Sequence, residues 1–247
     1  MLLEARKIAL LDRLYATYAR RLVRRAFAGV WIGGDAWPDD DVPILAIANH
    51  SAWWDPIVAL VLSHDVFRRD GYGIMLAATL ERFAFFRRVG CFGATTDSLA
   101  DARNLATYAA QVLRGAPRGG RARALWIFPQ GELLPARTRL RFRSGAARIA
   151  RLAPEATVVP LALRYELRAA QHPELFVRVG APLREAGRTL GPGELTRLMV
   201  RRVSEELARL DADLLEPDPA GYRLALRGRV SVSESRAASF GRARAVP

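Results

Sequence analysis

The sequence predicts an α/β protein with a mixed, mostly parallel sheet flanked by helices and preceded by an N-terminal amphipathic helix. Two observations lead to this prediction. Short apolar runs alternate with helix-like stretches from about residue 44 to residue 215, and the segment before them has helical periodicity. Since 51% of the 247 residues are hydrophobic, the chain can bury a sizeable core. We expect a helical segment within 1–30, a core domain over 31–217 and a basic, disordered tail over 218–247.

Residues 3–28 are expected to form the amphipathic helix. Its apolar stripe is Ile8, Leu11, Tyr15, Tyr18 and Leu22, and the basic stripe opposite is Arg6, Arg13, Arg20 and Arg24. Such a helix suits the surface of an acidic membrane, although the same apolar stripe could equally pack on the domain. No run of about 18 apolar residues occurs, so we expect peripheral membrane contact and no spanning helix.

The core elements follow in order after a break at Gly33, Gly34 and Pro38–Asp41. Short apolar runs predict strands at 44–48, 72–77, 91–94, 124–128, 157–163 and 175–180. Helices are expected at 56–62, 80–88, 98–114, 145–152 and 195–215. The alternation of the two kinds of element is what favours a mostly parallel sheet.

The net charge of +13 indicates anionic partners, which include nucleic acid, acidic lipid and phosphorylated ligands. The basic residues do not interleave with a recognised nucleic-acid motif, so no specific nucleic-acid partner is expected. Cys91 is the only cysteine, which excludes an internal disulfide and agrees with a reducing cytosolic setting. We expect it to be a buried structural thiol.

The sharpest local feature is the segment NHSAWWDP, Asn49 to Pro56, which directly follows the first buried strand. Asp55 and Pro56 are typical of a helix start, which places His50 in a tight turn at the carboxyl end of the strand. Ligands bind at that edge of open α/β sheets. A turn of this length lets Asp55 reach one imidazole nitrogen, which predicts a general base with an orienting carboxylate. Equally, Asp55 could only cap the helix and His50 could only be a turn residue.

Two adjacent tryptophans, Trp53 and Trp54, lie inside this segment. Such a pair is unusual in a loop at a soluble surface. The two rings could line a channel for an acyl chain or lie at the headgroup level of a membrane. They could also be part of the core.

A second feature is LWIFPQGELLP, Leu125 to Pro135, a strand with a sharp exit at Pro-Gln-Gly. Gly131 lets the backbone approach a ligand closely. After it, arginines alternate with other residues at positions 137, 139, 141 and 143. In an extended chain this period would put four guanidinium groups on one face, where they could grip phosphates. A solvated basic edge strand is the alternative.

Taken together, these segments resemble the glycerolipid acyltransferase family, whose best-known members acylate lysophosphatidic acid. The resemblance rests on four blocks in the order of the family over about residues 44–165. They are NHSAWWDP, FFRRVGCFGATTDS (Phe85 to Ser98), IFPQGELLP and VVPLAL (Val158 to Leu163). The first and third blocks carry most of the specificity.

The resemblance implies that His50 acts as the base on an acceptor hydroxyl and that Asp55 orients it. The hydroxyl would attack an acyl thioester directly, without a covalent acyl-enzyme. The implied donor is acyl-CoA or an acylated carrier protein, the acceptor is a lipid, and neither a cofactor nor a metal is expected. The enzyme would act peripherally on an anionic membrane, at its cytoplasmic face. Residues implied in substrate binding are Asn49, Ser51, Trp53, Trp54, Thr96, Phe128, Pro129, Gln130, Gly131, Glu132, Arg141 and Arg143.

Two positions depart from the pattern of the family. Gln130 stands where the third block usually has Glu, and Thr96 stands where the second block usually has a phosphate-binding Arg. Both positions belong to acceptor recognition in the family. A neutral second block suits an acceptor without glycerol phosphate, such as a glycosylated carotenoid. Alternatively, Arg141 and Arg143 replace the missing Arg, which would restore lysophosphatidic acid or a related lysolipid as the acceptor.

Other function classes find less support in the sequence. A hydrolase would need a nucleophile elbow of the Gly-x-Ser-x-Gly type, and the sequence has none. His50, His64 and His172, the only histidines, show no metal-ligand spacing. A non-catalytic basic protein that binds lipid or nucleic acid remains the alternative of another class, since charge alone gives weak binding.

Overall fold

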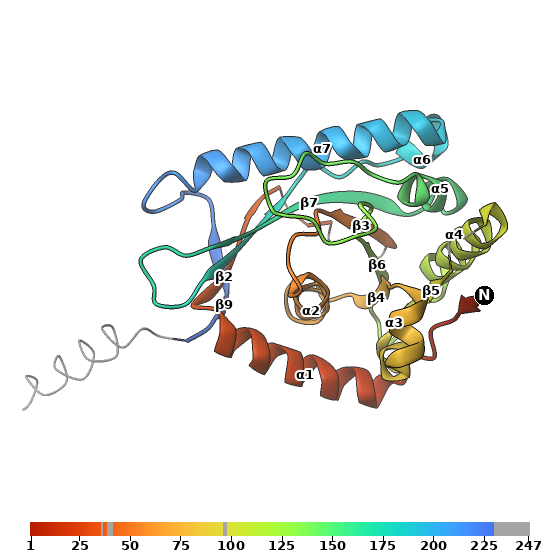
Figure 1. The fold of residues 1–247 in the computed structure, drawn as a ribbon, viewed down its shortest axis with the longest axis horizontal. Helices are drawn as coiled ribbons and strands as arrows, with labels where there is room; N and C mark the ends of the chain where they lie inside the picture. Colours follow the sequence, from red (N-terminus) through yellow and green to blue (C-terminus); the bar gives the residue numbers. More distant parts are fainter. Residues whose placement is uncertain (36, 39–41, 96–97, 230–247) are drawn as a thin grey trace, which may run out of the picture.

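The computed structural model describes residues 1–35, 37–38, 42–95 and 98–229, and within them one mixed sheet carries helices on both faces (Figure 1). Along the sheet, the strand order is β1-β5-β4-β6-β3-β7-β8-β2-β9. The strands are β1 (Leu2–Leu3), β2 (Gly29–Gly34), β3 (Ile44–Ala48), β4 (Asp70–Ile74), β5 (Cys91–Ala94), β6 (Arg123–Ile127), β7 (Thr157–Glu166), β8 (Glu174–Val179) and β9 (Arg223–Arg227). The helices are α1 (Ala9–Ala26), α2 (Asp55–Val61), α3 (Ala77–Arg82), α4 (Leu99–Arg114), α5 (Gly145–Leu152), α6 (Ala186–Thr189) and α7 (Pro192–Asp213), with a π-helical turn η1 (Leu62–Val66) and a 3-10 helix η2 (Ala84–Val89).

The pairing of the strands confirms the predicted mixed, mostly parallel sheet. β3 lies between β6 and β7 and is parallel to both, and β4 is parallel to β5 and β6. The antiparallel pairs are β1 with β5, β7 with β8 and β2 with β9. The carboxyl ends of β3, β4, β6 and β7 therefore lie along one edge, where residues that follow these strands can meet.

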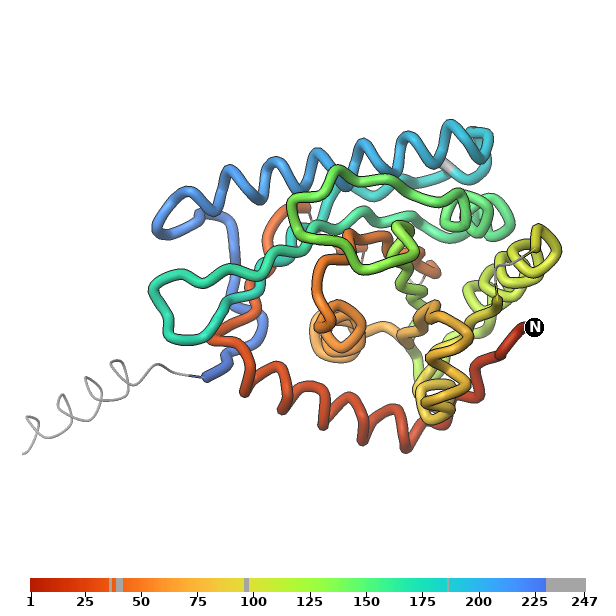
Figure 2. The backbone as a smooth tube through the Cα atoms, viewed as in Figure 1, coloured from red at the N-terminus to blue at the C-terminus, as the bar shows by residue number. Residues whose placement is uncertain are grey.

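Two apolar layers hold the helices on the sheet. In β3, Leu45 and Ile47 contact the layer that also contains residues of α4, α5 and α7. Ile44, Ala46 and Ala48 contact the other layer, which contains residues of α1 and α2. Because successive side chains of a strand point to opposite faces, a strand covered on both faces reads as a continuous apolar run. Figure 2 shows α7 and α1 running along opposite sides of the molecule.

The N-terminal segment differs from the continuous helix expected over 3–28. Leu2–Leu3 pairs with β5 through Leu2 and Ala94, and helix α1 begins only at Ala9. Between them, Lys7 is held in the core: its Nζ lies 2.7 Å from Asp70 Oδ1, 2.7 Å from Gly71 O and 3.2 Å from Asp12 Oδ2. These backbone and ion-pair contacts stop the helix from extending towards the N-terminus.

Helix α1 packs on the domain through a face that only partly overlaps the predicted apolar stripe. Ala16, Ala19 and Val23 are buried, and their small size brings the helix close to the domain. Of the predicted apolar stripe, Leu11, Tyr15 and Leu22 are half-buried and the Tyr15 ring packs against Phe85, whereas Ile8 and Tyr18 are exposed. Leu10 and Leu14, which lie outside that stripe, are also exposed. Among the described helices, none is long and apolar enough to span a membrane.

Two further expectations are corrected. The helix expected over 80–88 is divided at Phe83, whose φ of −127° and ψ of 65° end α3 before η2 begins. The sheet also continues past residue 217, because Arg223–Arg227 pairs with β2 at its edge. The predicted start of the tail at residue 218 is therefore wrong, and residues 230–247 lie outside the described part of the chain.

Candidate active site

The turn that carries His50 leaves the carboxyl end of β3 and is fixed to β7 by Asn49. Asn49 Nδ2 donates to Leu163 O at 3.1 Å, and Leu163 N donates to Asn49 Oδ1 at 2.8 Å. Asn49 is only 2% exposed, and its amide satisfies backbone groups at the end of the β3–β7 pairing. This side chain, expected to contact substrate, is thus engaged in holding the turn.

Within the turn, the side chains of His50 and Asp55 face each other. His50 Nδ1 lies 2.8 Å from Asp55 Oδ2. The same oxygen accepts hydrogen bonds from Ser51 N at 2.8 Å and Ala52 N at 2.9 Å. The Asp55 side chain is fully buried, whereas that of His50 is 19% exposed. Two backbone N–H groups and the His50 ring meet at one carboxylate oxygen, so the carboxylate is held where it can orient the ring and stabilise an imidazolium.

The structure decides between the two roles considered for Asp55. Helix α2 is preceded by Trp54 at its N-cap, and no side-chain bond caps its first turn. The Asp55 carboxylate is turned back towards Ser51 and His50 instead. Asp55 is therefore not merely a helix cap, because its bonds go to the turn that carries the imidazole.

Tyr165 is a further member of the site that the sequence analysis missed. Its hydroxyl donates to Asp55 Oδ1 at 2.5 Å. Burial raises the pKa of Tyr165 well above its ordinary value, and the charge of Asp55 and the hydrogen bond to it raise it further. Tyr165 lies two residues after the fourth sequence block, on the strand next to β3. That position, at the carboxyl end of a neighbouring strand, was the signal that could have identified it.

The third sequence block holds His50 from the other side. The ring of Phe128 stacks on the His50 ring at a centroid distance of 4.6 Å. Gln130 is 6% exposed, and its Oε1 accepts the backbone N–H of His50 at 2.7 Å. Leu134 N donates to His50 O at 3.1 Å. Both backbone groups of His50 are therefore bonded to the loop after β6.

The loop after β6 folds back on itself, so the predicted row of arginines on an extended strand is wrong. Thr138 N bonds to Pro135 O in a turn, and Arg143 N bonds to Pro129 O at 2.8 Å. The Arg143 side chain lies over Gly131, where a Cβ would come within 2.8 Å of its Nε. Since Gly131 also has a φ of +78°, only glycine fits this position without strain.

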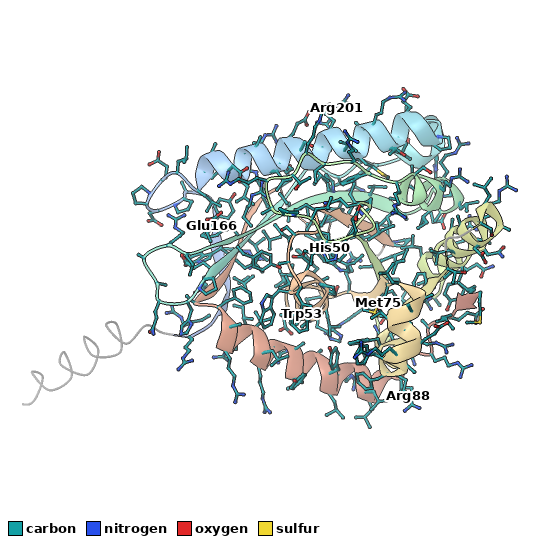
Figure 3. All side chains as sticks on the ribbon, in the orientation of Figure 1. His50, Trp53, Met75, Arg88, Glu166 and Arg201 are labelled. Carbon is teal, nitrogen blue, oxygen red and sulfur yellow. The ribbon has the colours of Figure 1, made fainter. Side chains whose placement is uncertain are left out.

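The other residues implied in binding lie in different surroundings. Trp54 packs against Phe27 at the end of α1, with ring centroids 5.2 Å apart, whereas Trp53 is 68% exposed. Glu132 and Arg141 are exposed on the loop after β6, and none of the described contacts joins them to the pair of His50 and Asp55, hereafter the dyad. Figure 3 shows His50 near the middle of the view and Trp53 on the side of the α2 helix. Ser51 contributes its backbone N–H to Asp55, and Thr96 lies outside the described residues.

Other features of the described residues can be compared with this site. A pocket of about 980 Å³ lies at the amino ends of β4 and β6, and its lining does not include His50. Among the described residues, no group of three or more His, Cys, Asp and Glu side chains could hold a metal ion. Burial raises the pKa of the Cys91 thiol to about 12, which keeps it protonated and unreactive at neutral pH.

Comparison with known proteins agrees with the blocks found in the sequence. Residues 32–164, more than half of the chain, match the acyltransferase family. The structure is similar to the crystal structure of the 1-acyl-sn-glycerophosphate (LPA) acyltransferase PlsC from Thermotoga maritima, with a TM-score of 0.57 and 16% sequence identity, over 81% of this chain and 80% of that chain. At that identity, the likeness establishes the fold. A search among curated proteins found no match. With the family match over the whole first to fourth blocks and the shared fold, this chain belongs to the acyltransferase family.

Proposed function

We propose that this protein is a membrane-associated O-acyltransferase that moves a fatty acyl group from an acyl thioester to a hydroxyl of a lipid. The observation that carries the proposal is the hydrogen bonding of the two nitrogens of the His50 ring. Its Nδ1 is held by the buried carboxylate of Asp55, and its Nε2 has no hydrogen-bond partner among the described residues. An imidazole held in this way can accept a proton from a hydroxyl that approaches Nε2.

The proposed reaction has two steps and no covalent acyl-enzyme. The acceptor oxygen attacks the thioester carbonyl carbon while Nε2 of His50 takes the hydroxyl proton. The tetrahedral intermediate then collapses, the carbon–sulfur bond breaks, and the leaving thiolate takes the proton from the imidazolium. The products are an ester and a free thiol. Acyl-CoA and an acylated carrier protein are both thioesters, and the proposed reaction needs no cofactor.

For the acceptor, we propose lysophosphatidic acid or a related lysolipid. Gln130 already bonds to His50 N, so recognition of an anionic headgroup falls to other residues. Arg143 lies over Gly131 within the loop that holds His50, and a guanidinium suits a phosphate well. The uncharged Thr96 in the second block favours the alternative, a glycolipid such as a glycosylated carotenoid.

For the partner, we propose an anionic membrane surface. Exposed apolar side chains come from α1 and the residue before it, from the turn before α2, and from the segment of α3 and η2, whose Phe85 packs on Tyr15 of α1. They are Ile8, Leu10, Leu14, Tyr18, Trp53, Leu76, Phe83 and Phe85. Apolar side chains exposed in such number favour an interaction surface. The net charge of +13 favours an acidic lipid layer over a neutral one. A surface of this kind would bring the acceptor lipid to His50 without a spanning helix.

A thiol-release assay tests the proposed function. Purified protein is given acyl-CoA or acylated carrier protein, each with lysophosphatidic acid, other lysolipids and glycolipids as acceptors. We expect the His50→Ala substitution to lower turnover at least about 100-fold, because it removes the base. His172→Ala is the matched control, since His172 lies in the turn between β7 and β8 and should leave turnover unchanged.

Two outcomes would refute the proposal. Turnover that survives His50→Ala would exclude the base mechanism. Binding to lipid or nucleic acid without thiol release from any donor would identify a non-catalytic basic protein instead. Preference for a glycolipid over every lysolipid would retain acyl transfer and change the acceptor.

A further inference from the structure

The two oxygens of the Asp55 carboxylate have different partners. Oδ2 accepts bonds from His50 Nδ1 and from the backbone of Ser51 and Ala52. Within the described residues, Oδ1 has one partner, the hydroxyl of Tyr165 at 2.5 Å. A short bond from a hydroxyl to a carboxylate is of the strong, charge-assisted kind. Because Asp55 is fully buried, water cannot replace that donor.

The ring of Tyr165 is itself held in place by aromatic neighbours. Phe27, the C-cap residue of α1, lies 5.6 Å from the Tyr165 ring and 5.2 Å from the Trp54 ring, measured between centroids. Phe27 is only 2% exposed. The hydroxyl therefore reaches Asp55 from a ring with little freedom to turn away, on a strand that is bonded to Asn49 at Leu163.

We propose that Tyr165 is a positioning residue for acyl transfer: it holds the Asp55 carboxylate so that Oδ2 faces His50 Nδ1 throughout the reaction. The phenol keeps its own proton, donates to Oδ1 and fixes the rotation of the carboxylate about its last side-chain bond. Without this donor, a buried oxygen loses its partner and the carboxylate can turn. His50 would then lose the partner that selects its tautomer and steadies the imidazolium. Tyr165 acts through Asp55 and does not touch the reacting atoms.

The kinetic test of this inference rests on the proposed acyl transfer. Tyr165→Phe keeps the ring and its packing and removes one hydroxyl. We expect kcat to fall at least about tenfold, which corresponds to about 1.4 kcal/mol, with the KM for both substrates nearly unchanged. Tyr108→Phe is the matched control, because its hydroxyl accepts a bond from Ala5 N away from the dyad. We expect it to keep the kcat of the parent protein.

A double-mutant cycle separates positioning from general packing. In an Asp55→Asn background, Tyr165→Phe should lower kcat little further, because the carboxylate through which the Tyr165 hydroxyl acts is already absent. The same loss in both backgrounds, or a kcat within twofold of the parent protein for Tyr165→Phe alone, would overturn the inference. If kcat fell in Tyr165→Phe but not in His50→Ala, the proposed function would be refuted instead of this inference.

A spectroscopic test does not depend on activity. The proton on His50 Nδ1, identified in the ¹H NMR spectrum by its loss in His50→Ala, reports its bond to Asp55. We expect its resonance to move in Tyr165→Phe and to stay in place in Tyr108→Phe. A resonance that is unchanged in Tyr165→Phe would overturn the inference even if no acceptor for acyl transfer had been found.

Discussion

At the scale of single residues, Gln130 stands where the glycerolipid acyltransferase family usually has Glu and supports the backbone of His50. Its Oε1 accepts the backbone N–H of His50, and the residue is almost fully buried. A glutamine meets this need with a neutral side chain, which avoids a second carboxylate close to the one that serves His50. The departure in the sequence therefore has a structural reason that is independent of the acceptor.

Replacing Gln130 by Ala should destabilise the fold by about 1–3 kcal/mol, because the buried N–H of His50 loses its acceptor. Turnover should fall as well, since His50 is no longer fixed from that side. Denaturant unfolding and the thiol-release assay measure the two effects. Gln111→Ala, on the exposed face of α4, should change stability by less than about 0.5 kcal/mol. Equal effects of the two substitutions would contradict the role of Gln130.

The site also shows which residues could be predicted from the sequence. His50 and Asp55 are five positions apart and lie in one turn, so their contact follows from local spacing. Tyr165 is 110 positions from Asp55, and only the adjacency of β3 and β7 brings it there. Gln130 was predicted as a site residue because it lies in the third sequence block. Its hydrogen bond to the backbone N–H of His50 could not be predicted, because such a bond leaves no pattern in a sequence.

At the scale of elements, α1 has a small buried face and a large exposed apolar one. Deleting residues 1–28 would also remove β1 and Lys7, so point substitutions give a cleaner test of membrane binding. Leu10 and Leu14 are 65% and 59% exposed and can change without disturbing the core.

We expect Leu10→Glu combined with Leu14→Glu to weaken sedimentation with anionic liposomes at least about tenfold, because two apolar contacts are lost and two negative charges are added. The melting temperature should remain near that of the parent protein. Leu215→Glu, at a leucine that is 84% exposed after α7, is the control and should leave binding nearly unchanged. If the double substitution bound liposomes as well as its control, α1 would have no part in docking.

The elements that were predicted well are those with a strong periodic signal. β3 and β5 have the predicted bounds, because a strand buried on both faces is a short apolar run between breaks. β9 was missed because its sequence, RLALR, has a charged residue at each end and reads as part of a basic tail. The arginines at 137–143 alternate like a strand, yet they belong to a loop closed by Arg143 N and Pro129 O. A pattern of period two does not by itself supply a neighbouring strand to pair with.

At the scale of the whole molecule, one buried ion cluster joins the N-terminal segment, α1, η1 and β4. Lys7 is the only lysine in a chain with 38 lysines and arginines. Its side chain is 3% exposed, and its three donors meet Asp70, Gly71 O and Asp12. The compact ammonium fits where a planar guanidinium would not. His64 contacts Asp12 from η1 at 3.1 Å.

Lys7→Met should destabilise the protein by about 3–5 kcal/mol, because two buried carboxylates lose their cation. The expected result is a clear fall in the midpoint of urea unfolding. Arg6→Met, at the exposed neighbouring position, should leave the midpoint close to its original value. Similar midpoints for both variants would show that the cluster does not stabilise the fold.

The hydrogen bonds around His50 also govern when the site can form during synthesis of the chain. The partner of His50 N, Gln130, is translated 80 residues later. Leu163, the partner of Asn49, follows after 114 residues, and Tyr165, the partner of Asp55, follows after 110. Until then, the NHSAWWDP segment has its apolar strand and its tryptophans but few of its lasting contacts. The turn that carries His50 is thus among the first parts of the core domain to be translated, and it can acquire its full set of hydrogen bonds only after β6 and β7 have followed.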